Sequence, residues 1–173
     1  MPLPNSASAL SRASEVREHD AVAALRIEPV TAVVGAQVEG ADLSQALPAE
    51  ERDAIERALL QYGVLFFAGQ DIGPEEQKRF ARLFGEISAP PFTPRYGSDP
   101  ELTVLDQVTP KGEGADQWHS DNTFMAEPPM GSVLRAVVLP SIGGDTCFAN
   151  MAAAYQALSP PMRGFVDGLS AVH

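Results

Sequence analysis

The chain has 173 residues, 45% of them hydrophobic, which is enough to bury one core but hardly two, so we expect a single domain or part of one. A net charge of -11 and an isoelectric point near 4.6 leave no basic patch that could neutralise phosphates, which argues against nucleic acid and anionic membranes as partners and favours small molecules. No apolar stretch approaches the roughly 20 residues that cross a bilayer. With a single cysteine, Cys147, the chain cannot form an internal disulfide, so we expect a cytoplasmic protein in which Cys147 is a small buried hydrophobe.

The N-terminal part predicts a tail followed by a β-hairpin. Residues 1–24 are rich in Ser and Ala and lack the continuous apolar region of a secretory signal, so we interpret them as a loosely attached tail in which His19 is a solvated surface residue. Residues 25–30 alternate apolar and polar side chains, as a half-buried strand does, and residues 36–40 are predicted to be the hairpin partner. Gly35 lies in the predicted turn.

Two helices with the same start signal follow. Pro48 and the two glutamates after it predict a helix start, because proline suits the first helical position and carboxylates suit the positive end of the helix dipole. This helix is expected to end at Gly63 and to lead into a short strand over residues 64–67, buried on both faces. Pro74 predicts a second helix that ends at Gly85. The side chains predicted to face the core are Ile55, Leu59, Tyr62, Phe80, Leu83 and Phe84.

A proline-rich stretch over residues 88–100 predicts a loop that carries Phe92, Arg95 and Tyr96. An arginine beside two aromatic rings suits an anionic organic substrate. An ordinary connection with a solvated arginine explains the same residues equally well. Residues 102–105 are then predicted to be a strand.

His119 and Asp121 carry the strongest chemical signal. In an extended segment the side chains at positions i and i+2 point the same way, so this pair can hold one ion. With a second histidine, an imidazole and a carboxylate make the facial arrangement of non-haem Fe(II) oxygenases, which leaves coordination positions open for a co-substrate and oxygen. Taken alone, a His-x-Asp tripeptide usually marks a surface loop or a hydrogen-bonded pair.

The C-terminal part alternates β-prone and helix-prone stretches. The apolar run over residues 132–139, interrupted by Arg135, predicts a strand. Two glycines then predict a turn into a second strand that contains Thr146, which on pattern alone is a simple strand residue. The predicted elements after residue 140 are a turn at 143–145, a strand at 146–148, a helix at 151–158, a helix starting at Ser159 and the start of a strand at 170–173.

Several separated motifs occur in a fixed order along the chain. They are Gly63-Val64-Leu65-Phe66-Phe67, Phe84-Gly85-Glu86, Trp118 to Phe124, Glu127 to Gly131, Leu139 to Thr146, and Ala153 to Pro160. Together they resemble the Fe(II)/2-oxoglutarate-dependent dioxygenases of the TauD/TfdA family. The resemblance covers residues 25–173.

The resemblance implies an α+β fold, a double-stranded β-helix (jelly roll) with flanking helices, of which residues 25–173 are the N-terminal part. It implies that His119 and Asp121 bind Fe(II) and that Thr146 helps to hold the distal carboxylate of the co-substrate 2-oxoglutarate. The implied reaction is hydroxylation of a small anionic substrate by O2, with release of succinate and CO2. The substrate pocket would include Phe92, Arg95 and Tyr96.

The resemblance also bears on the substrate. Taurine-specific members carry a histidine and a tyrosine in the loop after the Phe-Gly motif, and an asparagine four residues before the metal histidine. Here that loop has no histidine and Ala115 stands at the asparagine position, so taurine is disfavoured. Other sulfonates, sulfate esters and aryloxyalkanoic acids remain open.

In the family the second metal histidine and the arginine that clamps 2-oxoglutarate lie beyond the position of His173, and neither His19 nor His173 is a convincing substitute. We therefore expect the 173-residue chain to be inactive alone and to expose apolar surface. The rival interpretation is a non-catalytic protein, either a truncated remnant or a subunit that binds metal or a partner chain. A cupin-like domain, which usually has more histidines, ranks third, and homo-oligomerisation is left open.

Overall fold

The computed structural model describes residues 25–88, 99–105 and 117–171. The described chain divides into two compact units. The first contains residues 25–41 and 48–68, and the second contains residues 42–47 together with those from 69 onwards. The predicted tail over residues 1–24 lies outside the described residues.

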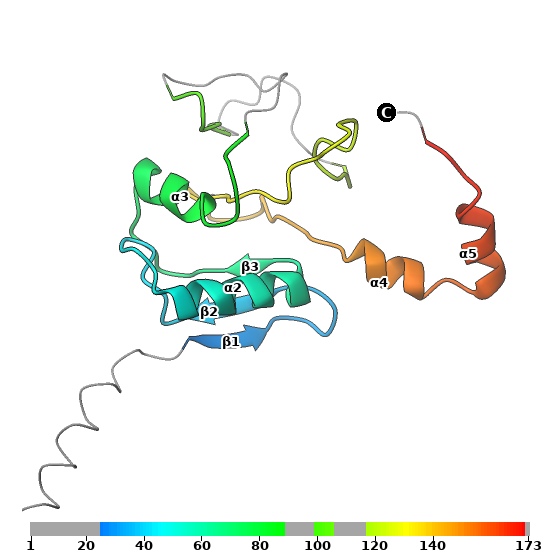
Figure 1. The fold of residues 1–173 in the computed structure, drawn as a ribbon, viewed down its shortest axis with the longest axis horizontal. Helices are drawn as coiled ribbons and strands as arrows, with labels where there is room; N and C mark the ends of the chain where they lie inside the picture. The colour runs from blue at the N-terminus through cyan, green and yellow to red at the C-terminus, as the bar shows by residue number, and fades with distance from the viewer. Residues whose placement is uncertain (1–24, 89–98, 106–116, 172–173) are drawn as a thin grey trace, which may run out of the picture. The chain divides into compact units, whose positions relative to one another are not determined.

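The first unit begins with the predicted β-hairpin. Strand β1 (Arg26–Pro29) pairs antiparallel with β2 (Ala36–Glu39), as Figure 1 shows. Gly35 accepts a hydrogen bond of 2.9 Å from the amide of the first residue after β1, which closes the connection. Side chains alternate along β2, so Ala36 and Val38 are buried and form part of the core.

A helix joins β2 to a parallel third strand. Helix α2 (Ala49–Tyr62) leads to β3 (Leu65–Phe66), and the sheet has the order β1-β2-β3. Parallel strands need such a crossover because a tight turn cannot join them. Ile55, only 1% exposed, lies on α2, which packs on β2 and β3. The helix ends as predicted at Gly63, whose φ of 72° is a left-handed conformation that costs glycine nothing.

The predicted burial of residues 64–67 on both faces is wrong. Strand β3 contains two residues, and Phe66 is 39% exposed. The reason is its position: among the described residues β3 is an edge strand, paired with β2 on one side only.

In the second unit, α3 (Pro74–Ala81) starts at the predicted proline. The Glu76 carboxylate accepts a hydrogen bond of 2.9 Å from the Gly73 amide and so caps the first turn. Phe80 is buried, whereas Leu83 is 37% exposed. The inward-facing prediction fails for Leu83 because the helix ends at Ala81, before the predicted Gly85, and helical spacing no longer governs the residues that follow.

Two short helices near the end of the described chain confirm the C-terminal helix predictions. They are α4 (Met151–Gln156) and α5 (Pro160–Val166). The Tyr155 hydroxyl donates a hydrogen bond of 2.7 Å to Asp167, just after α5, and this bond raises the pKa of Tyr155 above its ordinary value. Asn150 caps α4 by accepting from the Ala153 amide at 3.0 Å.

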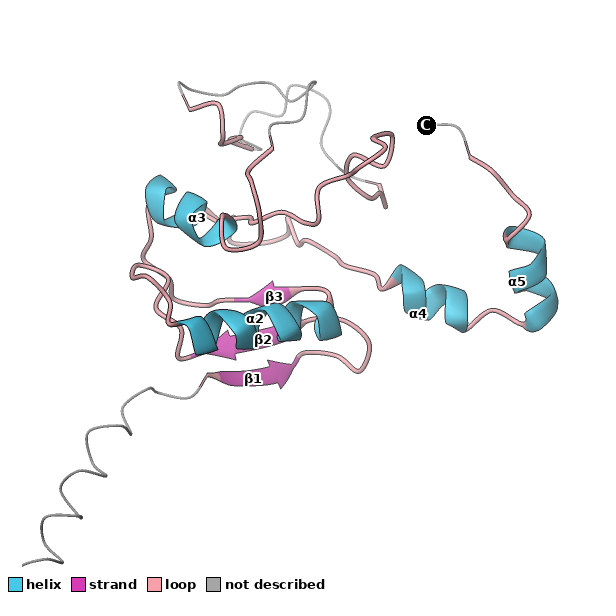
Figure 2. Ribbon diagram, in the orientation of Figure 1, coloured by secondary structure: helices cyan, strands magenta, loops and turns pink. Residues whose placement is uncertain are grey.

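The strands predicted at 102–105, 132–139 and 146–148 do not form. Figure 2 draws these residues as loop, and the described residues 170 and 171 are not a strand either. A strand needs a neighbouring strand to pair with its backbone groups, and among the described residues no strand pairs with these segments. The sheet of the described residues has three strands, so they show an α+β arrangement that is consistent with the predicted incomplete fold, and a closed jelly roll is not formed among them.

Apolar surface is exposed in the same region, as predicted. Residues 137–139 are 72 to 79% exposed and Ile142 is 90% exposed. Cys147 is also exposed, which contradicts its predicted burial, because the strand that would have buried it is not formed. In the described part of the chain no helix is both long and apolar enough to cross a membrane.

Candidate metal centre

His119 and Asp121 lie near the start of the described segment that begins at residue 117 and contains no helix or strand before α4. His119 Nε2 lies 3.2 Å from Asp121 Oδ1, and both side chains are more than half exposed. Ser120, between them, is in neither a helix nor a strand, so the chain here is free to point both side chains to one side. The predicted pairing of the two side chains is present, and their role as metal ligands stays a prediction.

A backbone contact sets the tautomer of His119. Its Nδ1 atom lies 2.8 Å from the Gln117 carbonyl oxygen. A carbonyl oxygen can only accept, so Nδ1 carries the hydrogen and donates it. A histidine that binds a metal usually donates its other ring N–H to such a carbonyl, which fixes the ring and leaves Nε2 for the metal.

The pair fits two neighbouring positions of a metal ion. Bonds of about 2.1 Å at a right angle would separate the two ligand atoms by about 3 Å. The observed separation is 3.2 Å. Among the described residues no third His, Cys, Asp or Glu joins the pair. The described chain therefore offers two candidate ligands, while His19 and His173 lie outside the described residues.

A turn with one left-handed residue follows the pair directly. Asn122 has a φ of 55° and is the only residue other than glycine with a positive φ in the described part of the chain. Its carbonyl oxygen accepts a hydrogen bond of 3.0 Å from the Met125 amide. Asparagine is among the few residues that tolerate this conformation. The turn therefore reverses the chain immediately after Asp121.

Thr146 lies two residues after Gly144. Gly143 and Gly144 have φ values of 75° and 74°, which glycine adopts readily, but the chain bends at residues 141 and 142 and forms no turn at the predicted residues 143–145. Thr146 is exposed, and no hydrogen bond links it to His119 or Asp121 within the described residues. Its proposed contact with 2-oxoglutarate stays a prediction. The candidate substrate residues Phe92, Arg95 and Tyr96 lie outside the described residues.

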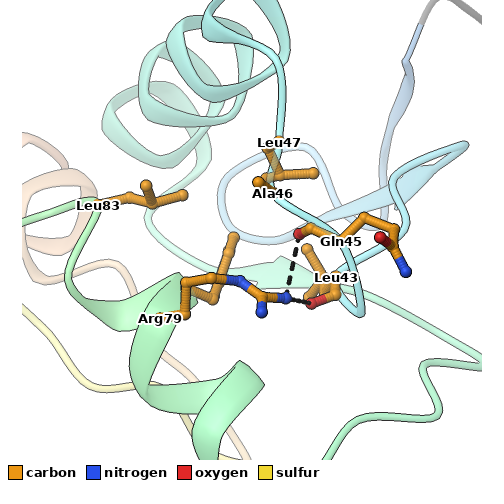
Figure 3. Close-up of a pocket in the computed structure, with 7 residues that line it drawn as sticks. Leu43, Gln45, Ala46, Leu47, Arg79 and Leu83 are labelled. Atoms are coloured by element: carbon orange, nitrogen blue, oxygen red, sulfur yellow. Dashed lines mark hydrogen bonds between the residues drawn. The ribbon is translucent and has the colours of Figure 1, made fainter.

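A small hollow elsewhere in the second unit contains none of the predicted site residues. It has a volume of about 80 Å³, and Figure 3 shows Arg79 beside it, donating to the carbonyl oxygens of Leu43 at 3.0 Å and Gln45 at 3.2 Å. Pockets that enclose small-molecule ligands start at roughly 300 Å³. We therefore assign this hollow to packing. It is lined by Leu43, Gln45, Ala46, Leu47, Arg79, Phe80 and Leu83.

One buried ion cluster was not predicted. Lys78, which is 7% exposed, contacts Asp99 at 2.7 Å and Glu75 at 2.8 Å. Hydrogen bonds to Asp99 and then to Glu75 raise the pKa of Lys78, and the Lys78 ammonium holds the pKa of Asp99 below its usual range. A lysine on a helix ordinarily indicates a solvated face, so no sequence signal marked this one.

A second polar network joins Gln77 to Arg135, with Gln77 Oε1 and Arg135 Nε 3.3 Å apart. Here the sequence did offer a signal, because Arg135 interrupts an apolar run. A charged side chain in such a position needs a partner, and Gln77 is one of the groups that supply it.

A carboxylate and an imidazole at chelating distance define this chain as a candidate metal-binding protein. A family model described as taurine catabolism dioxygenase TauD, TfdA family, matches residues 26–173. The chain belongs to the TauD/TfdA family, a family of 2-oxoglutarate-dependent dioxygenases.

Individual relatives agree with this assignment. An alpha-ketoglutarate-dependent sulfate ester dioxygenase of Pseudomonas putida is 43% identical over 86% of this chain and 49% of its own length. An alkylsulfatase of Acinetobacter baylyi is 38% identical, over 86% of this chain and 47% of its own. The crystal structure of a taurine dioxygenase from Burkholderia xenovorans superposes with a TM-score of 0.72 at 36% identity, covering 83% of this chain and 51% of that one. The chain thus spans about half the length of the relatives that it matches.

Proposed function

We propose that the protein is an Fe(II)- and 2-oxoglutarate-dependent dioxygenase that hydroxylates a small anionic organic substrate. The observation that carries the proposal is the His119–Asp121 pair, 3.2 Å apart in a chain of this family. The hydrogen bond from Nδ1 to the Gln117 carbonyl supports it, because this bond leaves Nε2, which faces Asp121 at 3.2 Å, as the ring nitrogen that can bind a metal. The jelly-roll architecture of the whole domain is part of the same proposal.

In this proposal the residues of this chain bind the metal ion and orient 2-oxoglutarate. His119 and Asp121 hold two coordination positions, and Gln117 keeps the imidazole ring in place. The Thr146 hydroxyl donates a hydrogen bond to the distal carboxylate of 2-oxoglutarate. Fe(II), when bound, supplies the position at which 2-oxoglutarate and O2 react. One oxygen atom enters the substrate as a hydroxyl group and the other enters succinate, with loss of CO2.

Among the three open substrate classes, we propose sulfate esters as the first to test. A sulfate ester dioxygenase and an alkylsulfatase are among the most similar relatives, at 43% and 38% identity. Hydroxylation of the carbon that bears the sulfate oxygen would give an unstable product that fragments to an aldehyde and sulfate. Phe92, Arg95 and Tyr96 are proposed to contact the anionic substrate, with the guanidinium pairing with its negative group.

The test is succinate formation by the protein purified as its native gene makes it, because the 173-residue chain by itself is expected to be inactive. The assay contains Fe(II), 2-oxoglutarate and one of three substrates: an alkyl sulfate, an alkanesulfonate or an aryloxyalkanoate. We expect substrate-stimulated succinate with the alkyl sulfate. We expect His119→Ala to abolish it, because one of two described ligands is lost, and His19→Ala to leave it unchanged as the matched histidine control. No stimulation by any of the three would overturn the proposed substrate class.

Measuring metal binding together with succinate formation distinguishes the proposed enzyme from the non-catalytic alternative. Co(II), a spectroscopic substitute for Fe(II), reports on the site without turnover. Metal binding that is lost in His119→Ala, combined with no succinate from any substrate, would favour a subunit that binds metal without turning over. Metal affinity equal in the wild type and His119→Ala would overturn the metal centre itself.

A further inference from the structure

Three hydrogen bonds join the start of α3 to residues 133–135 within the second unit. Gln77 Nε2 donates to the Val133 carbonyl oxygen at 2.9 Å, and Arg135 Nε donates to Gln77 Oε1 at 3.3 Å. Arg135 Nη1 donates to the Ile72 carbonyl oxygen at 2.6 Å. All three are partly buried and link positions at least 56 residues apart in the sequence. We call Gln77 and Arg135 the clamp.

The clamp has only one chemically sensible arrangement. The Gln77 amide uses its nitrogen as a donor and its oxygen as an acceptor at the same time, so turning the amide over would place donor against donor and oxygen against oxygen. The guanidinium of Arg135 has a fixed fork of donors and uses two of them here. Residues 133–135 are therefore held in a defined register against α3.

The helix side of the clamp is itself anchored. Glu76 caps the first turn of α3 through the Gly73 amide. The pKa of Glu76 is lowered chiefly by hydrogen bonds from backbone amides and further by the positive charges of Arg79 and Arg135. The clamp thus grips the capped first turn of a helix rather than a fraying end.

The held segment occupies a particular place in the chain. Residues 133–135 lie about midway in the sequence between the His119–Asp121 pair and Thr146. These are the two parts that 2-oxoglutarate must contact together if it chelates the metal at one end and meets the threonine hydroxyl at the other. Whatever fixes the chain between them restricts how the two parts can be presented to one molecule.

We propose that Gln77 and Arg135 are positioning residues for 2-oxoglutarate, holding residues 133–135 so that the metal pair on one side and Thr146 on the other reach the same co-substrate. The inference rests on the proposed function. Because the metal pair is made by residues two apart, its affinity for the metal alone does not depend on the clamp, whereas affinity for 2-oxoglutarate does.

The experiment measures two affinities of the purified protein, for Co(II) alone and for 2-oxoglutarate added to the Co(II) form, by absorption and calorimetry. Gln77→Leu removes both bonds of the amide. We expect it to weaken 2-oxoglutarate binding about tenfold, as loss of an outer positioning contact typically does, and to leave Co(II) affinity unchanged. Arg135→Met should act similarly, and Arg135→Lys should restore part of the loss. Gln61→Leu, at an exposed position of α2, is the matched control.

A double-mutant comparison separates positioning from general destabilisation. If the clamp acts through Thr146, Gln77→Leu should cost little further 2-oxoglutarate affinity in a Thr146→Val background. An equal loss in both backgrounds, or no loss, would overturn the clamp while leaving the proposed function intact. If Gln77→Leu does not fold, Gln77→Glu, which keeps the acceptor for Arg135 but not the donor to Val133, takes its place. Failure of His119→Ala to change Co(II) affinity would instead mark failure of the proposed function.

Discussion

Single residues determine the geometry of the candidate metal centre, and one of them, Asn122, is not a candidate ligand. His119 is oriented through the Gln117 carbonyl, and Asp121 is followed at once by Asn122 in a left-handed conformation. A residue in this conformation costs energy unless it is glycine or asparagine. This left-handed position lies one residue after a candidate ligand and turns the chain away from it.

Replacement of Asn122 tests this account. Asn122→Ala should destabilise the protein by about 1 kcal/mol, because alanine pays the full cost of a positive φ, and should weaken Co(II) binding through Asp121. Asn122→Gly should retain both stability and Co(II) affinity. Thermal unfolding and Co(II) titration would measure the two effects. Equal behaviour of the alanine and glycine variants would show that the turn does not need this backbone conformation.

Helix α3 makes its contacts in the second unit partly through polar side chains, which a sequence pattern would place on the surface. Its Lys78 is buried among carboxylates, and its Gln77 reaches Val133 and Arg135. Removing one partner of a buried charge leaves the other uncompensated, so such clusters define geometry more than they add net stability. Through these two side chains α3 bonds to Asp99 at 2.7 Å and to Val133 at 2.9 Å.

Because of the ion cluster, we expect the free energy of unfolding of this unit to fall at acid pH, and we call this fall the acid limb. The pKa of Asp99 lies below its ordinary value of 3.8, chiefly because of the hydrogen bond from Lys78. The unfolded chain therefore takes up the proton first as the pH falls, so the stabilisation is complete above about pH 5 and is lost as the pH falls through 3.8 and below. Asp99→Asn should lower stability at pH 7 and flatten this limb.

The measurement is urea unfolding followed by circular dichroism across this pH range. The limb should shrink rather than vanish in Asp99→Asn, because Asp42 and Glu76 also have lowered pKa values and remain. Arg57→Gln, on the exposed side of α2, is the control. An acid limb as steep in Asp99→Asn as in the wild type would contradict a role for this carboxylate.

At the scale of the molecule, burial is distributed unevenly. The first unit contains Ala36, Val38, Ile55 and Ala58, each no more than 3% exposed. In the second unit the apolar residues 137–139 and Ile142, here called the exposed apolar run, are 72 to 90% exposed. Because apolar burial is the main driving force of folding, stability should be concentrated in the small sheet and α2.

Matched substitutions measure this difference. Val138→Thr and Ile142→Thr should each change the free energy of unfolding by less than about 0.5 kcal/mol, as expected for exposed positions. Ile55→Ala should cost about 2 to 5 kcal/mol, because it opens a cavity in the core. Denaturant unfolding provides the comparison. A cost above 1 kcal/mol at Val138 or Ile142 would mean that a further surface covers this run in solution.

The sequence by itself determined the parts that local chemistry governs. Proline with paired glutamates located the starts of α2 and α3, and Gly63 located the end of α2. The alternation of side chains located β1, and β2 was predicted as its hairpin partner. The spacing of His119 and Asp121 predicted that their side chains would meet. Each of these depends on residues within one or two turns of backbone.

Only the tertiary structure decided what depends on distant partners. The β-prone runs at 102–105, 132–139 and 146–148 form no strand because a strand exists only beside another, and propensity cannot supply the neighbour. The burial of Lys78 and the clamp between Gln77 and Arg135 join residues at least 21 positions apart. No local pattern encodes such pairings, because their energy comes from groups that meet only after the chain has folded.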